Sequence, residues 1–371
     1  MSLTRLDLVD EDVALDLAGP DVRVFLVPGA VMVLGALGTV IITDAGDDPA
    51  VSGVWNDGEF RLIGPAPAPV RTRLMGPMPF TTHLAEVPKL PVHLAVRVDG
   101  RCLYLGVVQV GICEGVDNEL ISCNLWIDPP LSRETLAVVR PPGATPVLPG
   151  LEWLEQVGTD PRRALEIFVT GWYPETDPAP HARTIPGFVP PALADFYRLA
   201  EKRPAILGQQ NFIEPLAKLT RGSHGGRMVF AVENQGGWDW SIPQQLNIAG
   251  TDPDVGLTSG DAPVPEREPL SRFLLQFSLH EAAVSAPYQA GAQGVPELLL
   301  PPLESLLRRV PLRPFMAPIV PKTFLVGPGV VAQVSPSYHS KNEVTVQIGA
   351  HHRGALRPLG ELGLDWRRFD G

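Results

Sequence analysis

The first third of the chain is dominated by apolar runs that have the spacing of β-strands. Ile121, Cys123, Leu125 and Ile127 alternate with polar positions, which predicts a strand with one face on a core. The other runs share this alternation or are continuously apolar and bounded by turn residues. The six predicted strands cover residues 22–27, 31–34, 39–43, 92–98, 103–110 and 120–127. The pattern therefore predicts a β-rich domain over residues 1–140.

Helical spacing takes over beyond residue 132. Ser132 and Asp160 are typical N-cap residues before short apolar stripes, and Ser271 is expected to cap a longer helix. Near the end, a strand is predicted where Val, Val and Ile alternate with polar residues. The apolar positions that indicate these elements are Leu165, Phe168, Val169, Leu193, Phe196, Tyr197, Ala200, Phe273, Phe277, Val284, Leu303, Leu306, Leu307, Val310, Val344, Val346 and Ile348.

These patterns predict an α+β protein. We expect the β-rich domain to be followed by a linker with short helices over residues 141–184, because Pro and Gly are frequent there. Residues 185–371 are then expected to form an α+β domain in which helices pack on a mostly antiparallel sheet.

A hairpin is predicted within that second domain. Met228, Phe230 and Val232 alternate with residues that face the other way, and the period resumes at Trp238 and Trp240 after a glycine-containing reversal. The two indoles are expected on one face, at the core or its edge. Glu233, Asn234 and Gln235 are expected to bond local backbone groups and fix the turn.

The hairpin also carries a family resemblance. Glu233-Asn234-Gln235-Gly236, followed by Trp238 and Trp240, resembles the signature of the SUKH superfamily, which has the Smi/Knr-like fold. The helix-like segment 190–200 and the following Gln209-Gln210-Asn211 are similar to the opening of that family, so the resemblance covers about residues 185–371. It implies an immunity protein, because many bacterial members bind and neutralise toxins. Residues 1–140 resemble no family that we recognise.

Composition narrows the functional classes. The chain has 371 residues, of which 44% are hydrophobic, and a formal net charge of -11. An acidic chain is a poor candidate for binding nucleic acid through phosphates, whereas a basic protein partner suits it. Its three cysteines, Cys102, Cys113 and Cys123, include no CxxC pair, so we expect free buried thiols and a cytoplasmic location.

One apolar segment needs a membrane test. Residues 24–42 contain no charged side chain and approach the length that crosses a bilayer. However, acidic residues precede this run, and Pro28-Gly29, Gly35 and Gly38 divide it. We therefore predict buried strands joined by tight turns and no membrane partner.

The histidines of this chain do not have the residue spacing of catalytic or metal-binding motifs. His280-Glu281 begins like a zincin motif, but Val284 stands where the second histidine is needed, so His280 is expected on an ordinary helix surface. His351 and His352 are not expected to chelate a metal, because neighbours on a strand face opposite ways, and we expect an exposed pair beside Arg353.

Other chemical signatures are also missing from the sequence. His224 lies in a Gly-rich loop without a GxSxG elbow, and no glycine loop is followed by a Walker lysine. We expect no cofactor, no metal and no enzymatic activity.

The sequence thus favours a cytoplasmic immunity protein that occludes a bacterial toxin, such as a nuclease or another basic effector. Acidic positions near the hairpin, Glu233, Asp239, Asp252 and Asp254, are the candidate contacts, because of their charge and expected exposure. An alternative is a cytoplasmic adaptor or scaffold that binds two protein partners, and a third is an enzyme with a site between the domains. The full set of candidate motif and binding residues is Glu233, Asn234, Gln235, Gly236, Trp238, Asp239, Trp240, Asp252 and Asp254.

Overall fold

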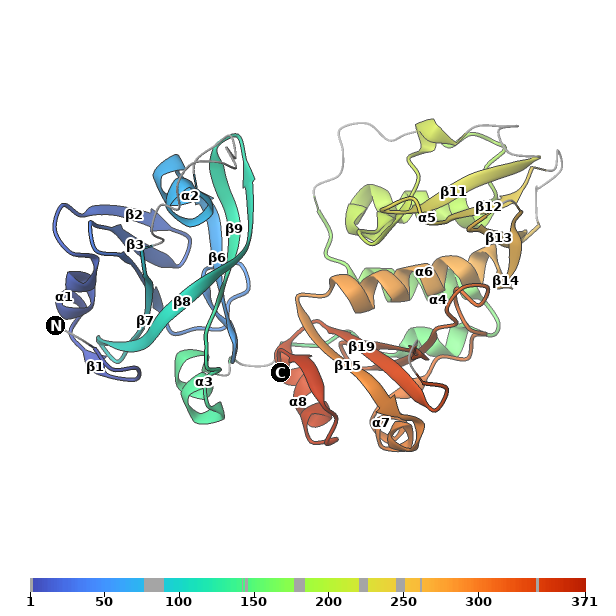
Figure 1. Ribbon diagram of the computed structural model, residues 1–371. Coiled ribbons are helices and arrows are strands. Elements are labelled where there is room, and N and C mark those ends of the chain that lie inside the picture. The colour runs from blue at the N-terminus through green and yellow to red at the C-terminus, as the bar shows by residue number, and fades with distance from the viewer. Residues whose placement is uncertain are drawn as a thin grey trace. The chain divides into compact units, whose positions relative to one another are not determined.

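The chain folds into two compact units, Met1–Ala144 and Thr145–Gly371, each with its own hydrophobic core (Figure 1). The computed structural model describes residues 3–76, 90–141, 143, 146–176, 184–219, 226–244, 251–260, 262–337 and 340–371.

The first unit is a nine-stranded sheet with three short helices. The sheet order is β2-β3-β4-β7-β8-β9-β6-β5, with β1 paired to β8, and only the β4–β7 pair is parallel among these described strands. The strands are β1 (Leu8–Val9), β2 (Arg23–Val27), β3 (Ala30–Leu34), β4 (Thr39–Asp44), β5 (Gly53–Asn56), β6 (Glu59–Ala66), β7 (Val92–Val98), β8 (Arg101–Val116) and β9 (Glu119–Trp126). The helices are α1 (Glu11–Leu15), α2 (Ala68–Met75) and α3 (Arg133–Val139).

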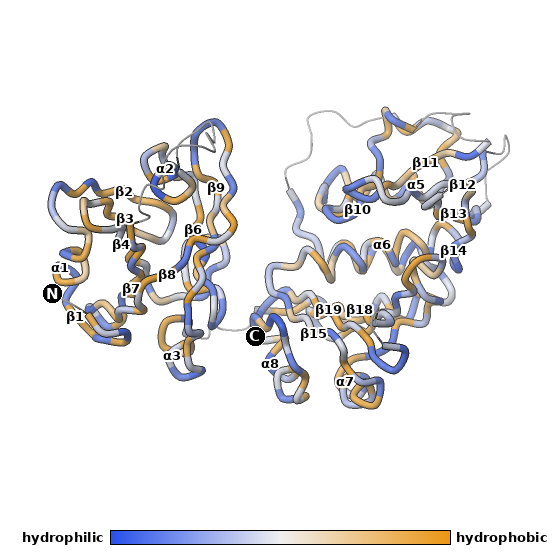
Figure 2. Tube along the Cα trace, in the orientation of Figure 1, coloured by the Kyte–Doolittle hydropathy of each residue, from blue (hydrophilic) through white to orange (hydrophobic). Residues whose placement is uncertain are grey.

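All six strands predicted for this unit are present, and their hydrophobic residues are visible along the trace (Figure 2). The apolar run 24–42 supplies β2, β3 and β4, as predicted. Among the described residues, no helix combines the length and the apolar character needed to cross a membrane. β1, β5 and β6 were not predicted.

Strand β9 departs from the predicted alternation. Leu120 is buried and Ile121 is 41% exposed, whereas Cys123 and Leu125 are buried as expected. The reversal follows irregularities in the register between β9 and both of its neighbours, where extra residues are accommodated. The prediction that Ile121 points into the core was therefore wrong, because a β-bulge shifts the two-residue period.

The cysteines also differ from expectation. Cys113 and Cys123 are directly opposite each other on β8 and β9 and form a disulfide, while Cys102 is a buried free thiol. The expectation of three free thiols was wrong, because the register that places the pair together cannot be read from the cysteine spacing. With this disulfide, the cysteines no longer indicate a cytoplasmic location.

The second unit contains two antiparallel sheets and five α-helices among the residues described. One sheet has the order β10-β11-β12-β13-β14 and the other β16-β17-β18-β19-β15-β20. The strands are β10 (Asn211–Ile213), β11 (Arg227–Glu233), β12 (Asp239–Pro243), β13 (Asp254–Thr258), β14 (Val264–Pro269), β15 (Tyr288–Pro296), β16 (Arg308–Arg309), β17 (Thr323–Gly327), β18 (Val330–Pro336), β19 (Glu343–Ala350) and β20 (Trp366–Phe369). The helices are α4 (Pro161–Trp172), α5 (Pro191–Lys202), α6 (Leu270–Ser285), α7 (Leu300–Leu306) and α8 (Arg353–Gly360).

Helix α6 lies between the two sheets (Figure 1). Thirteen of its sixteen residues are buried, because it contacts α4 and α5 as well as strands of both sheets. On the side of β19, Gly349 permits a close approach, since a Cβ there would lie 2.4 Å from the carbonyl oxygen of Ala282. On the same helix, the ring of Phe273 lies within 6 Å of the rings of Phe230, Trp240 and Phe315. The core of the second unit is thus organised around one helix.

The helix caps test the sequence-based boundaries. The Ser132 hydroxyl accepts from the backbone N–H of Thr135, and the Asp160 carboxylate accepts from that of Arg163, so both predicted caps are confirmed. Ser271 does not cap α6, because the Asp252 carboxylate, 19 residues earlier, accepts from both the N–H and the hydroxyl of Ser271. A cap supplied from another segment leaves no local sequence signal.

The region assigned to a linker also differs from expectation. Helix α4 falls within residues 141–184, and its buried residues Leu165, Phe168 and Val169 belong to the core of the second unit. The second unit therefore begins before α4 rather than at residue 185. Leu306, expected on a buried helical face, is 46% exposed at the end of α7.

Replacing Phe273 tests the role of α6. Phe273→Ala removes a fully buried ring, and we expect the free energy of unfolding of the second unit to fall by about 3–5 kcal/mol. Urea denaturation of the full chain measures this change, with Leu306→Ala as a matched control at an exposed apolar position. A loss below about 1 kcal/mol for Phe273→Ala would contradict a core built around α6.

Candidate protein-binding site

The predicted hairpin is present, and the Glu233 side chain fixes its turn. Strands β11 and β12 pair in antiparallel fashion, and the Glu233 carboxylate accepts hydrogen bonds from the backbone N–H groups of Gln235 (2.9 Å) and Gly237 (3.1 Å). The Gly236 N–H donates to the Glu233 carbonyl oxygen, and Gly236 has a φ of 75°, which favours glycine. The predicted turn-fixing role of Glu233 is confirmed.

The same geometry contradicts the expectation that Glu233 contacts a protein partner. Its side chain was expected to be exposed, yet Glu233 is only 6% exposed because its carboxylate faces the turn. Asn234, Gln235 and Gly236 are the exposed residues of the signature.

A second carboxylate holds the neighbouring loop. Glu281, in the middle of α6, is fully buried, and its oxygens accept from the backbone N–H groups of Gln209 (2.7 Å), Gln210 (3.0 Å) and Asn211 (2.9 Å) and from the side-chain amide of Asn211 (3.0 Å). Four donors to one carboxylate compensate for its removal from water. Before this loop, Gly208 has a φ of 96°, and a Cβ there would lie 1.8 Å from the Asn211 carbonyl oxygen.

The loop and the hairpin turn are joined to each other. The side-chain amide of Gln210 donates to the Glu233 carboxylate (3.3 Å), and the Asn234 N–H donates to the Gln210 carbonyl oxygen (3.2 Å). Strand β10 then pairs with β11, beginning with Asn211 opposite Glu233. The two sequence segments that carry the family resemblance therefore meet, and Glu281 anchors them from α6.

The exposed side of this assembly continues onto the sheet. Phe212, Val232, Asp239 and Thr258 are directly opposite one another on β10, β11, β12 and β13. They form one row on the face away from Trp240, because side chains alternate along a strand. Phe212 is 40% exposed at the edge of this row. We call the side chains of Gln209, Gln210, Phe212, Asn234, Gln235 and Asp239 the hairpin surface.

Both tryptophans of the signature lie on the core side, as predicted. Trp240 is fully buried, its indole N–H donates to the Glu266 carboxylate (3.0 Å), and its ring stacks on Phe315. Burial raises the pKa of Glu266. Trp238 is half-buried and meets Trp240 edge to face, with ring centroids 6.3 Å apart. The indoles thus stabilise the sheet from behind the hairpin surface.

The remaining acidic candidates are separate from the turn. Asp252 is exposed, but its carboxylate accepts hydrogen bonds from the N–H and the hydroxyl of Ser271 and thereby caps α6. Asp254 is exposed at the start of β13; burial lowers the pKa of Arg227, and the negative charge of Asp254 partly opposes that shift. Of the four proposed acidic contacts, only Asp239 lies in the hairpin surface.

The histidines have structural positions that the sequence did not predict. His280 is 2% exposed and bonds the side chain of Gln333 on β18 (2.7 Å), so its assignment to a helix surface was wrong. Burial lowers its pKa to about 3, with a smaller contribution from the positive charge of Lys322. Burial likewise lowers the pKa of Lys322 to about 8, while the negative charge of Glu281 opposes that shift.

His351 and His352 are not an exposed pair. The His351 ring bonds the Trp172 carbonyl oxygen (2.6 Å), and His352 accepts from the Gly354 N–H at the start of α8. Both positions were predicted wrongly, because His351 contacts α4 and His352 caps α8. His224 lies outside the described residues.

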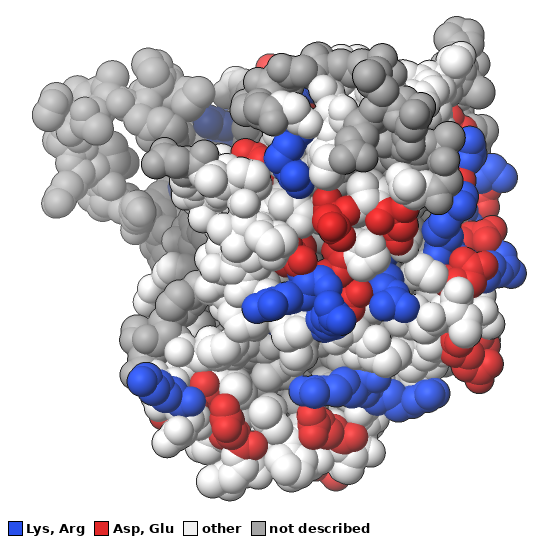
Figure 3. All heavy atoms as spheres, turned by 90° about the vertical axis from the view of Figure 1, so that its right-hand side faces the viewer, with Lys and Arg blue, Asp and Glu red and all other residues white. Residues whose placement is uncertain are grey.

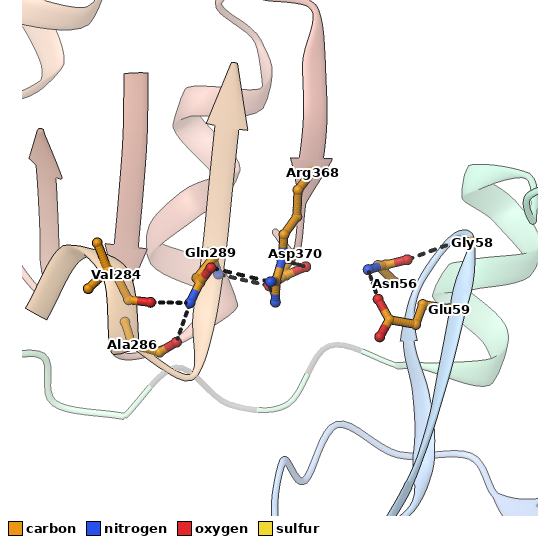
Figure 4. A network of polar contacts seen from close by, with 8 residues as sticks. All are labelled: Asn56, Gly58, Glu59, Val284, Ala286, Gln289, Arg368 and Asp370. Atoms are coloured by element: carbon orange, nitrogen blue, oxygen red, sulfur yellow. Dashed lines mark hydrogen bonds and ion pairs between the residues drawn. The ribbon is translucent and has the colours of Figure 1, made fainter. Parts of the chain in front are cut away.

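Other polar groups also serve the structure (Figure 4). In the second unit, the buried Asp370 carboxylate accepts from the Gln289 N–H and from Arg368, which joins β15 to β20. In the first unit, Asn56 bonds Glu59 and the Gly58 N–H at the turn between β5 and β6. Within the described part of the chain, no group of three or more His, Cys, Asp or Glu side chains could hold a metal ion.

A cavity of about 610 Å³ lies between α4 and α5, but its charges are paired. Arg162 and Arg198 both bond Asp195, and Arg163 bonds Glu166. Basic and acidic side chains are likewise interleaved on the face of the second unit shown in Figure 3. Because these basic and acidic side chains already pair with one another, they are poorly suited to bind an ionic ligand.

Comparison with protein-family models, with curated proteins and with solved structures gives no match. The structure is a mixed α+β protein with several sheets, and of the nine predicted site residues the hairpin surface contains Asn234, Gln235 and Asp239.

Glu281→Gln tests the anchor of this site. The substitution replaces an acceptor oxygen with an amide that faces N–H donors, so we expect a loss of about 3 kcal/mol in the free energy of unfolding of the second unit. Urea denaturation measures the loss, with Glu304→Gln, at a partly exposed side chain, as the control. Equal stability of the two variants would contradict the anchoring role.

The buried His280 should make the free energy of unfolding of the second unit depend on pH. Its pKa is about 3 in the folded chain, below the ordinary 6.5, so the unfolded chain binds the extra proton between these values. The stability linked to neutral His280 is therefore complete above pH 6.5 and is lost as the pH falls toward 3. Relative to His280→Gln, the wild type should lose about 1.4 kcal/mol per pH unit in this window. Parallel stability curves for the two proteins would contradict it.

Proposed function

We propose that this protein is a non-enzymatic immunity protein that binds a bacterial toxin and occludes it. The observation that supports this proposal is the hairpin surface, which unites the two segments of the SUKH resemblance in one place. The core-facing tryptophans and the buried carboxylates hold that surface, and the exposed amides, Phe212 and the half-buried Asp239 are left for a partner.

The physical basis for tight binding is a surface that is already ordered. Glu233 bonds the turn and Glu281 bonds the adjacent loop, so little backbone freedom remains to be lost when a partner binds. Phe212 offers an aromatic anchor at a strand edge, and Asp239 offers one negative charge to a basic toxin. An interface of about 1,600 Å² around these groups is the ordinary size for a stable complex.

The buried polar groups favour binding over catalysis. The Glu281 carboxylate is saturated by four donors within the chain, and His280 is bonded to Gln333. Groups that bond within the chain and lie at 0% and 2% exposure are poorly placed to act on a substrate.

A scaffold that binds two protein partners is the second candidate. The observation that favours it is the presence of a separate folded unit, with its own core, before the unit that carries the hairpin surface. The nature of the partner separates the candidates, because an immunity protein abolishes the toxicity of its partner. A toxin gene beside the gene for this chain favours immunity, whereas a signalling or cell-envelope operon favours a scaffold.

Affinity capture from the native cell tests the proposal. The full chain is used as bait, and each captured protein is expressed alone and together with the chain. We expect one captured protein to be toxic alone and harmless when co-expressed. Capture of only non-toxic proteins would contradict the immunity function.

Substitutions in the hairpin surface then locate the contact. Phe212→Ala and Asp239→Lys should each raise the Kd for the captured toxin at least tenfold, and Asp239→Lys should also reduce the dependence of binding on salt. Asp365→Lys is the charge control, because Asp365 is exposed elsewhere in the same unit. A toxin that binds all three variants as tightly as the wild type would place the contact elsewhere.

A further inference from the structure

The negative charge of this chain is concentrated in its first unit. Residues 1–144 contain 18 acidic and 10 basic side chains, a net charge of -8, whereas residues 145–371 contain 23 and 20, a net charge of -3. A basic toxin is therefore attracted mainly by the first unit, although the hairpin surface lies in the second. The surfaces of the first unit therefore carry most of the negative charge that could attract such a partner.

One face of that unit presents apolar side chains to solvent. Gln109, Trp126 and Glu59 are directly opposite one another on β8, β9 and β6, on the side away from the core. Trp126 is 49% exposed, Val107 two residues before Gln109 is 51% exposed, and Ile112 on the same strand is 70% exposed. We call this region of β6, β8 and β9 the Trp126 face.

The Trp126 indole lies against the backbone of β8 at Gly111. A Cβ at Gly111 on β8 would lie 2.9 Å from the indole ring, so only glycine at this position allows the ring to lie against the strand. The register irregularity between Val110 and Cys113 includes Gly111 and Ile112. A half-exposed aromatic ring that packs against the backbone is a typical anchor for a partner, because it offers a large contact area at a small cost in side-chain freedom.

The opposite end of the sheet shows how such a face is normally covered. On β3 and β4, the outward residues Val33 and Val40 are buried in a cluster with Ala14 of α1 and with Ala18. Within the described residues, no hydrophobic cluster includes Trp126, Val107 or Ile112. Several exposed large apolar side chains on the strands of one region are a feature of interaction sites.

The surroundings of the Trp126 face are acidic. Glu59 and Glu114 lie on its strands, and Asp117 and Glu119 lie at the β8–β9 turn. Two basic residues lie on these strands: the guanidinium of Arg61 is 5.3 Å from the ring centroid of the buried Trp55, and Arg101, at the start of β8, is paired with Asp10. An apolar centre with an acidic rim is complementary to a partner with an exposed apolar side chain surrounded by Lys and Arg.

We infer that the Trp126 face is a second binding surface for the toxin, with Trp126 as its anchor and the acidic rim as its electrostatic guide. This inference rests on the proposed function, and it specifies the partner as a basic protein with an apolar centre to its contact region. It also gives the first unit a role that the family resemblance does not supply.

The test uses the full chain and the toxin identified by affinity capture. Trp126→Ala should raise the Kd at least tenfold, mainly through faster dissociation. Glu59→Lys combined with Glu114→Lys should slow association at least tenfold at low salt, with a smaller effect at high salt. Leu26→Ser is the matched control, because Leu26 is 78% exposed on β2 and should leave binding unchanged.

The outcomes separate the two claims. If wild-type chain captures no toxin, the proposed function fails and the inference fails with it. If the toxin binds but Trp126→Ala changes the Kd less than twofold, only the inference is overturned. Sedimentation of the chain alone is the second readout: a dimer that Trp126→Ala dissociates would show that another copy of this chain covers the face, which also overturns the inference.

Discussion

A carboxylate buried in the middle of a helix must receive hydrogen bonds from the protein, and this requirement organises the second unit. Glu281 lies on α6, between two sheets, where water cannot solvate its charge. Three consecutive backbone N–H groups and one side-chain amide approach it from the loop before β10. The position of that loop, and of the edge strand that follows it, depends on this interaction.

The candidate site results from the same constraint. Once the loop is fixed by Glu281, Gln210 reaches the Glu233 carboxylate, and Glu233 bonds the hairpin turn. Two buried carboxylates therefore hold a surface whose exposed members are mostly neutral amides and one aromatic ring. A basic partner would find little negative charge there, which is consistent with a separate contribution from the acidic first unit.

The sequence predicted the features that depend on neighbouring residues. Alternation and continuous apolar runs bounded by turn residues located the strands from β2 to β4 and from β7 to β9, and the polar reversal between two apolar runs located the hairpin at Glu233. Side-chain caps at Ser132 and Asp160 were equally local. Features that depend on distant contacts were missed: Glu281 acts on residues about 70 positions away, and Asp252 caps a helix that begins 18 residues later.

Irregular strand pairing explains the other differences. Strand β6 contains Gly64 and Pro65, which obscure its alternation, and the bulges beside β9 turn Ile121 outward. The pairing of Cys113 with Cys123 follows from the same register. The burial of His280 could not be predicted from the sequence. It results from the packing of both sheets against α6, which leaves almost no solvent-exposed face on this helix.

Hydrogen–deuterium exchange of the full chain, with and without the captured toxin, measures the central claim most directly. The account predicts slow exchange at residues 209–211 in the free protein, because Glu281 bonds these amides, and additional protection at residues 209–212 and 234–239 when the toxin binds. Fast exchange at residues 209–211 in the free chain, or toxin-dependent protection that leaves both segments unchanged, would contradict it.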